Sequence, residues 1–378
     1  MALLEGLERY AGQQPRASRT VVRAPLDSLT APALAPRPVH GYPDEVYARH
    51  PFLLAPFRGD QETDWVWGYS FARSAPVLVP KALAYYGPQS PGEQFVIGSS
   101  SGCATGSCLE EAALYGLLEL IERDAFLLAW HTAAHLPEIL PDSCATPETA
   151  DTVDRMRALG YEIRLFDLRA DLPFPVVLCT AVRREPGPGN LCMSAGAALD
   201  PEEAALTAVR EVATYLPGFG ARVRRQEQRL RAIAADYDKL VDLPQHALLY
   251  GLPEMADRVP APFTAPREHA GTLAEAFEDW QRLRPRHTDL RDLLLFTVDA
   301  VRALGDDVVV VEQTCPEQSV IGVRTAAVIA PGLVPIDFGW ERQRVLHSER
   351  LRTVRHRAAR TDGPVRADAV HRHPHPFM

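Results

Sequence analysis

Residues 102–131 read GCATGSCLEEAALYGLLELIERDAFLLAWH, and this stretch determines more of the fold than any other. Small residues open it, and an uninterrupted apolar helical sequence follows that nevertheless contains Glu111, Glu119 and Glu122. At about 100° per residue, Glu119 lies about 80° and Glu122 about 20° round the helix axis from Glu111. Because burial of unpaired carboxylates is costly, this shared face requires metal ions, basic partners or raised pKa values.

The two ends of this helix carry further signals. We expect the helix to begin near Ser107, with Ser107 as N-cap and Glu110 at the capping-box position. The preceding loop, residues 99–107, is either an anion site at the helix N-terminus or a flexible connector. At the other end, His131 and His135 lie one turn apart and are candidates for metal ligands or for buried and capping roles.

The pattern Glu-x-x-Glu-Arg occurs twice, at residues 5–9 and 119–123. An i, i+3 pair projects two carboxylates from one helical face, and two facing pairs form an oxygen-lined cavity suited to Mg2+. The neighbouring arginines could balance charge or bind phosphate. Ordinary helical surface with internal ion pairs is the alternative, and the apolar surroundings of residues 119–123 argue against it there. Glu211 is the acid of a third helix.

Composition limits the class of protein. The chain has 378 residues, is 46% hydrophobic and carries a net charge of −9, which argues against a nucleic-acid-binding surface. No apolar run is long enough to cross a membrane, and the N-terminus lacks the features of a secretory signal. The six cysteines are scattered rather than arranged as a disulfide framework, so we expect a cytoplasmic protein.

Apolar periodicity places strands and helices in irregular alternation. A helix at residues 151–160, closed by Gly160, precedes a strand at 161–168, and a further helix covers 201–215. Other strands are predicted at residues 65–69, 77–80, 175–183, 306–313 and 322–329. The fold class is therefore α+β.

Standard nucleotide-binding motifs are absent from the sequence: it contains no P-loop, no kinase glycine-rich loop and no dinucleotide fingerprint. Lysine occurs only at Lys81 and Lys239. Any phosphate group would therefore have to be held by arginine, metal ions and backbone N–H groups.

Five segments in order resemble motifs of the YcaO family, specifically the azoline-forming cyclodehydratases that make thiazole- and oxazole-modified peptides. They are ALLEGLERYAG, SSSGCATGSCLEEAALYGLLELIERDAFLLAWH, SAGAALDPEEAALTAVREV, VVVVEQTCPE with the following VIAPGL and DFG, and the terminal PHPF. The resemblance covers essentially the whole chain. It implies a YcaO-like ATP-binding fold with mixed sheets and with acidic helices lining a central nucleotide site.

The resemblance also implies a domain organisation. We expect a single YcaO-like domain over residues 1–378, with a helical insertion at roughly 221–300 and an active-site tail at 365–378. A ThiF-like, leader-binding domain is not expected in this chain. The family has a helix and a Gly-Lys-Gly segment upstream of its first motif, so the N-terminus is expected to be truncated.

By the resemblance, Glu5, Glu8, Glu119 and Glu122 correspond to magnesium ligands. The positions that correspond to nucleotide contacts or lie beside the ligands are Ser107, Glu111, Arg9, Arg123 and Glu211. The tail residues Pro374, Pro376 and Met378 correspond to the segment that takes part in catalysis. Some positions depart from the family: Ser107 stands for Asn, Thr214 for Gln, Leu216 for Arg, and Met378 for the last proline, while Met1 occupies a serine position.

The implied cofactors are ATP and Mg2+, and the implied reaction is cyclodehydration of Cys, Ser or Thr in a ribosomal precursor peptide. The side chain attacks the preceding amide, ATP phosphorylates the amide oxygen, and loss of phosphate leaves a thiazoline or oxazoline. Implied partners are a ThiF-like or leader-recognition protein, a downstream azoline dehydrogenase and a second copy in a homodimer. Alternatives are a non-catalytic scaffold or allosteric subunit, or the same ATP chemistry used for thioamidation or amidine formation.

Overall fold

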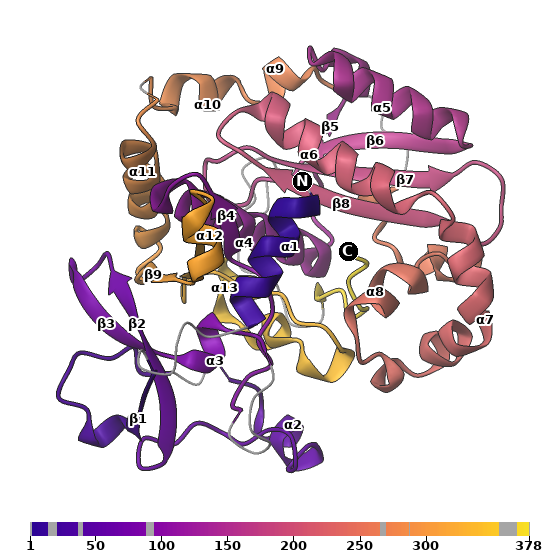
Figure 1. The fold of residues 1–378 in the computed structure, drawn as a ribbon. Coiled ribbons are helices and arrows are strands. Elements are labelled where there is room, and N and C mark those ends of the chain that lie inside the picture. Colours follow the sequence, from indigo (N-terminus) through magenta and orange to yellow (C-terminus); the bar gives the residue numbers. More distant parts are fainter. Residues whose placement is uncertain are drawn as a thin grey trace. The chain divides into compact units, whose positions relative to one another are not determined.

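The computed structural model describes residues 2–13, 21–36, 41–87, 94–264, 270–286, 288–354 and 369–377. The chain forms two compact units (Figure 1). The first consists of Met1–Leu120 and Pro285–Pro335, and the second of Ile121–Arg284 and Ile336–Met378. The chain passes from the first unit to the second within helix α4, Leu109–Thr132.

The first unit contains a six-stranded antiparallel sheet with the order β1-β2-β9-β10-β4, in which β3 also pairs with β2. Its strands are β1 Val21–Pro25, β2 Glu62–Ser70, β3 Ala75–Pro80, β4 Cys103–Gly106, β9 Val309–Glu312 and β10 Arg324–Ile329. Valines on alternate positions of β3 and β9, such as Val77, Val79, Val309 and Val311, are buried in one core cluster. β-branched side chains pack well on a pleated surface, which explains why these short runs form strands.

Helices of the first unit include α1, Ala2–Gln13, and α11, Leu290–Arg302. The shorter ones are α2 Asp44–Arg49, α3 Lys81–Ala84 and α12 Pro316–Val320. Asp289 caps α11 by accepting hydrogen bonds from the backbone N–H groups of Arg291 and Asp292. This cap satisfies two of the donors that a helix N-terminus leaves unpaired.

The second unit contains a four-stranded antiparallel sheet with the order β5-β6-β7-β8. Its strands are β5 Glu138–Ile139, β6 Tyr161–Asp167, β7 Val176–Arg183 and β8 Leu191–Ala197. Helices α5, Pro147–Ala158, and α6, Pro201–Tyr215, pack on this sheet (Figure 1). Gly160, with φ +89°, closes α5 before β6, as the sequence predicts.

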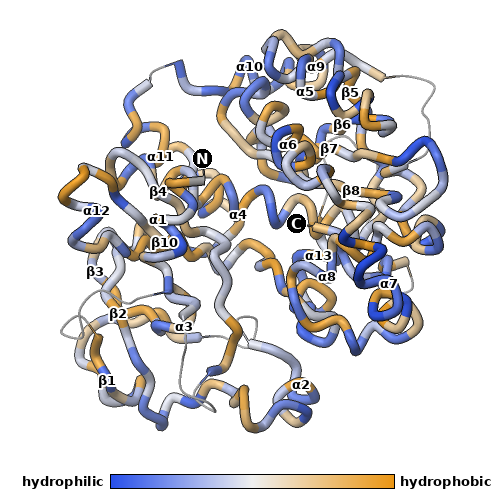
Figure 2. Tube along the Cα trace, turned by 45° about the vertical axis from the view of Figure 1, so that its right-hand side comes forward, coloured by the Kyte–Doolittle hydropathy of each residue, from blue (hydrophilic) through white to orange (hydrophobic). Residues whose placement is uncertain are grey.

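The remaining helices of the second unit are α7 Phe219–Ala235, α8 Leu243–Leu249, α9 Leu273–Ala276, α10 Glu278–Leu283 and α13 Glu349–Thr353. Figure 2 shows blue, hydrophilic and orange, hydrophobic positions mixed along α7. The buried positions of α7, Phe219, Val223, Leu230 and Ile233, lie on one stripe, while most of its arginines are exposed. No helix within the described ranges is sufficiently long and apolar to span a membrane.

Two sequence predictions require correction. We expected mixed sheets, but every pairing between described strands is antiparallel, and parallel pairing occurs only as isolated bridges such as Ala33 with Leu78. The alternation of apolar residues predicts a strand but does not encode its direction.

The second correction concerns the start of α4. The helix begins at Leu109, and β4 occupies part of the segment predicted as a loop. The Ser107 N–H and hydroxyl donate to Glu111 rather than forming a capping box with Glu110. The small residues of β4 are accommodated as a strand because they pair with β10, from Cys103 opposite Ala327 to Gly106 opposite Arg324.

Candidate active site

Helix α1 is held in the first unit by contacts at its middle and at its C-terminal end. The side chain of Gln318, which is fully buried, donates from Nε2 to the Leu7 carbonyl at 2.9 Å and to Thr325 Oγ1 at 2.8 Å. At the C-terminal end of the helix, the Tyr86 N–H donates to the Gly12 carbonyl at 3.1 Å. A Cβ on Gly12 would lie 2.4 Å from the Tyr86 ring, so only glycine allows this approach. These contacts fix the direction in which the acids of α1 point.

Glu8 of α1 lies in an acidic environment. Its burial, followed by the charges of Glu119 and Glu5, raises the pKa of the Glu8 carboxyl from 4.5 to about 8, and Arg9 opposes the shift only in part. Glu5 is exposed and forms an ion pair with Arg9 at 2.5 Å. Without a cation, Glu8 would therefore be largely protonated near neutral pH.

Glu119 of α4 is positioned by the turn that precedes β4. Its Oε2 accepts a hydrogen bond from the Gly102 N–H at 3.2 Å. Gly102 has φ +84°, and a Cβ there would lie 2.5 Å from the Val328 carbonyl oxygen. On the facing turn of α4, a Cβ on Gly116 would lie 2.4 Å from the Gly102 carbonyl oxygen. The small residues of this motif are thus required for the backbone to approach α4 closely enough to bond Glu119.

Two groups beside these acids were not identified from the sequence. Tyr86 Oη is buried and has no hydrogen-bond partner among the described residues. Cys103 is completely buried, and its burial and the charges of Glu8 and Glu119 raise the pKa of its thiol well above the usual value. Tyr86 follows an apolar run that contains no motif, so the sequence gives no signal for it. Its contact with Gly12 in the structure places it in this site.

The first turn of α4 holds Glu111 in a separate arrangement. Its carboxylate accepts from the Ser107 N–H at 2.6 Å and from the Ser107 hydroxyl at 2.7 Å. These hydrogen bonds hold the pKa of Glu111 below its usual value. Of the three acids expected on one buried face, Glu111 and Glu119 are half-buried, and Glu122 is buried, with 8% of its surface exposed.

Glu122 lies in the second unit, one turn after Glu119. Its Oε2 accepts a hydrogen bond from the Ala197 N–H at the end of β8, at 3.1 Å. Arg123 forms an ion pair with Glu122 at 3.2 Å, and its guanidinium lies 4.1 Å from the centre of the Phe377 ring. Arg123 therefore connects the acid of α4 with the C-terminal tail.

The described part of the tail, residues 369–377, is bonded into the second unit at successive carbonyl groups. Trp130 Nε1 donates to the His373 carbonyl at 3.0 Å, and the Tyr250 hydroxyl donates to the Pro374 carbonyl at 2.6 Å. His246 Nδ1 donates to the His375 carbonyl at 2.8 Å. The described tail is therefore held in place along its length, and its residues 374–377 are buried.

The DFG segment, residues 337–339, also holds the tail. His375 Nε2 donates to the Asp337 carbonyl at 3.0 Å, and the Gly339 N–H donates to His246 Nε2 at 2.9 Å. Both nitrogens of His246 are thereby used in one neutral tautomer. Pro374 and Pro376 lie in this bonded segment, whereas Met378, like residues 365–368, lies outside the described residues.

Other polar residues in and after the central segment differ in their surroundings. Asp124, the remaining acid of the central motif, forms a two-point ion pair with Arg350 at 2.6 and 2.7 Å. His131 is fully buried, its Nδ1 donates to the His371 carbonyl at 2.8 Å, and burial lowers its pKa to about 3. His135 is exposed. Asp124 thus has a basic partner and His131 has the buried role considered from the sequence, whereas His135 does not have a buried role.

The structure brings the predicted site residues together in part. Glu5, Glu8, Arg9 and Glu119 interact in the first unit, and Glu122 and Arg123 interact with each other in the second. Glu211 is exposed on α6. Within the described residues, no three His, Cys, Asp or Glu side chains already form a metal-binding group.

The sequence pattern of the family described as YcaO cyclodehydratase, ATP- and Mg2+-binding, matches residues 1–334. The chain belongs to the YcaO family. This family binds ATP and Mg2+. The carboxylate donors of α1 and α4 fit Mg2+, which prefers oxygen ligands, and a cation would offset the burial and the neighbouring negative charges that raise the pKa of Glu8.

Among curated relatives of this YcaO protein is an uncharacterized protein of Methanothermobacter thermautotrophicus, 29% identical over 259 residues, which cover 65% of this chain and 61% of the relative. Another is an uncharacterized protein in the tfuA 3′ region of Rhizobium leguminosarum bv. trifolii, 29% identical over 300 residues, which cover 73% of this chain and 62% of the relative. The chain thus spans about three fifths of the curated relatives it matches.

Solved structures show the same fold. A heterocyclase in complex with substrate and cofactor matches with a TM-score of 0.74 and 25% identity, over 99% of this chain and 48% of that one. YcaO from Methanopyrus kandleri, bound with AMPPCP and Mg2+, matches with a TM-score of 0.60 and 23% identity, over 88% of this chain and 74% of that one.

Proposed function

We propose that this YcaO protein uses ATP and Mg2+ to cyclise Cys, Ser or Thr residues of a ribosomal precursor peptide to thiazolines or oxazolines. The observation that carries the proposal is the gathering of acidic side chains from α1 and α4, where a cation would offset the negative charges beside Glu8. Family membership and the likeness to a heterocyclase at 25% identity support the choice of reaction.

The proposed reaction balances as a dehydration coupled to ATP cleavage. The thiol or hydroxyl group adds to the preceding carbonyl carbon and loses its proton, and the amide oxygen takes the terminal phosphoryl group as ADP leaves. The C–O bond then breaks, phosphate departs, and loss of the amide N–H proton leaves a C=N bond. Phosphorylation is needed because oxide or hydroxide is a poor leaving group.

The chain's own residues would serve this reaction in distinct ways. Glu5, Glu8, Glu119 and Glu122 would hold Mg2+, which when bound supplies positive charge to the phosphate oxygens. Ser107, Glu111, Arg9, Arg123 and Glu211 are the proposed nucleotide contacts. Pro374, Pro376 and Met378 are the proposed catalytic residues of the tail, and the terminal carboxylate would take part in proton transfer.

A precursor-modification assay tests this function. Purified protein, Mg-ATP, a cognate precursor and a leader-recognition partner should give a product that has lost one water mass for each ring. The Glu119→Gln variant should abolish the mass change, because it removes a charge with little change in volume. Unaltered precursor with the wild-type protein and every partner combination would refute the proposal.

Thioamidation is the second candidate, because the relative from Rhizobium leguminosarum is named for its place beside tfuA rather than for a heterocyclase. The ATP-dependent activation would be the same, with sulfide replacing the internal nucleophile. The same mass measurement separates the two reactions. A thioamide replaces oxygen by the heavier sulfur, whereas an azoline loses water.

A further inference from the structure

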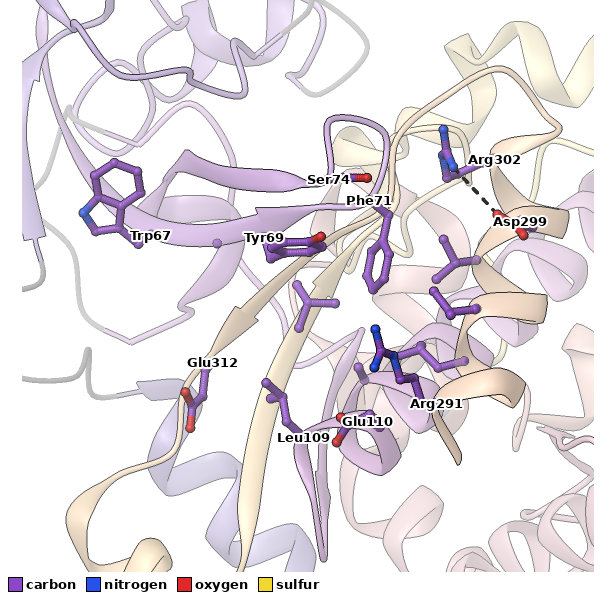
Figure 3. Close-up of a pocket in the computed structure, with 16 residues that line it drawn as sticks. Trp67, Tyr69, Phe71, Ser74, Leu109, Glu110, Arg291, Asp299, Arg302 and Glu312 are labelled. Carbon is purple, nitrogen blue, oxygen red and sulfur yellow. Dashed lines mark ion pairs between the residues drawn. The ribbon is translucent and has the colours of Figure 1, made fainter. Parts of the chain in front are cut away.

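A pocket of about 630 Å3 lies in the first unit and shares no lining residue with the group formed by Glu5, Glu8 and Glu119. It lies between the sheet and α11, and the first turns of α4 complete its wall (Figure 3). Residues 291, 294, 295, 298 and 302 of α11 recur at helical spacing along its lining. We call it the aromatic pocket, after the three β2 and β2–β3 residues that line it, Trp67, Tyr69 and Phe71.

These three aromatic side chains form a row with a repeat of two residues (Figure 3). Trp67 is 46% exposed and Tyr69 is 43% exposed, and the Tyr69 and Phe71 rings meet edge to face at 5.4 Å. Grouped aromatic exposure of this kind is typical of binding surfaces. In an extended peptide, every second side chain also points the same way, so its repeat matches the row.

The pocket is also lined by a charged donor and a charged acceptor. Arg291 and Glu110 both face the pocket, and neither forms an ion pair within the part of the chain that the structure describes (Figure 3). A peptide group has one C=O acceptor and one N–H donor, so its main chain can bond to both side chains at once. A purely apolar ligand would leave both charges desolvated and unpaired.

A second guanidinium lies beyond Phe71 at one end of the row. Arg302 approaches Asp299 only to 3.7 Å, and its Nε is buried without a hydrogen-bond partner among the described residues. A carboxylate entering this end could complete the hydrogen bonds of Arg302. The end of the pocket therefore favours an acidic residue.

We propose that the aromatic pocket binds an extended segment of the precursor peptide that has apolar side chains at alternate positions and an acidic residue after them. The apolar side chains contact Trp67 and Tyr69, the main chain bonds to Arg291 and Glu110, and the acidic side chain reaches Arg302. This inference rests on the proposed function, which makes a peptide the substrate. It adds a binding site outside the acidic site.

Fluorescence anisotropy without ATP tests the pocket directly. The probes are the fluorescein-labelled synthetic peptide Leu-Ser-Leu-Ser-Glu and its counterpart ending in Lys. The wild-type chain should bind the Glu peptide about tenfold more tightly than the Lys peptide, and Trp67→Ala or Arg291→Ala should weaken the Glu peptide about tenfold. Arg302→Ala should remove the preference between the two peptides.

Matched substitutions outside the pocket provide controls. Phe52→Ala removes a side chain that is 90% exposed, and Arg58→Ala removes an exposed arginine, both in the first unit. Both controls should bind the Glu peptide like the wild type. Equal affinity in pocket variants and controls, or no binding to the wild type, would overturn the proposal.

Two further measurements distinguish peptide binding from misfolding of the variants and from dimer formation. Mg-ATP calorimetry on Trp67→Ala and Tyr69→Ser should match the wild type, which shows that the variants are folded. If the peptides fail to bind while Mg-ATP binding and precursor modification persist, the pocket proposal fails and the proposed function stands. If sedimentation instead shows a dimer that Trp67→Ala dissociates, the occupant is a second copy and the peptide proposal is wrong.

Discussion

At the scale of single residues, Glu8 and Tyr86 define the acidic site of the first unit. Glu8 has a carboxyl whose pKa is raised to about 8 by burial and by Glu119 and Glu5. The Tyr86 hydroxyl is buried there without a hydrogen-bond partner within the described residues. A site that bound a hydrated cation would satisfy both groups, because the ion offsets the negative charge and its waters can bond the hydroxyl.

The Tyr86→Phe variant tests this account. Removing an unsatisfied buried hydroxyl should stabilise the metal-free protein by about 1 kcal/mol or leave it unchanged. Addition of Mg-ATP should then raise the unfolding temperature by less than in the wild type, because the bound state loses a hydrogen bond. A larger rise in Tyr86→Phe, measured by differential scanning calorimetry, would contradict this role.

A residue of this site can be predicted from the sequence only when a local sequence pattern marks it. The acids of α1 and α4 recur as Glu-x-x-Glu-Arg, a local pattern that helical geometry converts into a shared face. Tyr86 and Gln318 carry no such pattern, since their roles depend on contacts with α1 across long sequence separations. The sequence likewise could not show that Asp124 pairs with Arg350, which lies 226 residues later.

At the scale of elements, helix α1 is positioned by a close contact at its C-terminal end. Its C-terminal end rests on Tyr86 through Gly12, and a Cβ on Gly87 would lie 2.0 Å from the Gln13 carbonyl oxygen. Two glycines at one contact thus allow helix and loop to meet. By contrast, a Cβ on Gly6 of the same helix would meet nothing within 4 Å.

This contrast gives a matched pair of variants in one helix. Gly12→Ala should weaken Mg-ATP binding at least about tenfold, because α1 or Tyr86 must move to admit the methyl group. Gly6→Ala should leave binding unchanged and stabilise the protein by up to about 1 kcal/mol through helix propensity. Equal Mg-ATP affinity in the two variants, measured by calorimetry, would show that α1 is not held as described.

The position of the C-terminal tail depends on contacts with buried histidines that are neutral. Burial lowers the pKa of His246 from 6.5 to about 4, and the His246 ring stacks on His375 with centroids 4.2 Å apart. The pKa of His246 is lower in the folded chain than in the unfolded chain. The neutral His246 ring therefore contributes its full stabilisation above pH 6.5, and this contribution is lost as the pH falls towards 4. The tail should therefore be the acid-sensitive part of the second unit.

Urea unfolding at pH 7 and pH 5 tests the histidine contribution. The wild type should lose on the order of 2 kcal/mol between these pH values through His246 alone. His246→Asn keeps a donor for the His375 carbonyl but cannot titrate, so its loss should be smaller. An unfolding free energy with the same pH dependence in both proteins would contradict the assignment.

Element boundaries were predictable where caps and periodicity agree, and less so elsewhere. Helix α6 covers residues 201–215 as predicted, because Asp200 caps it and Pro201 stands at its first position. Strand β4 was missed, since residues 103–106 are small and their pairing with β10 involves residues more than two hundred positions away. The alternation of apolar residues does not encode strand direction, which is why the prediction of mixed sheets is wrong for these antiparallel sheets.

At the scale of the whole molecule, two compact units share one long helix, α4. Glu119 lies before the boundary and Glu122 after it, so the i, i+3 pair belongs to both units. Motif resemblance predicted the family from five ordered segments, and the family's sequence pattern confirms it over residues 1–334.

In the proposed site, the carboxylates of α1 and α4 hold Mg-ATP, and isothermal titration calorimetry measures this binding. The wild-type chain should bind a non-hydrolysable ATP analogue with Mg2+, and Glu119→Gln should weaken that binding at least about a hundredfold. Glu45→Gln, an exposed acid of α2, should bind like the wild type. Wild-type affinity in Glu119→Gln, with folding confirmed by circular dichroism, would contradict the account.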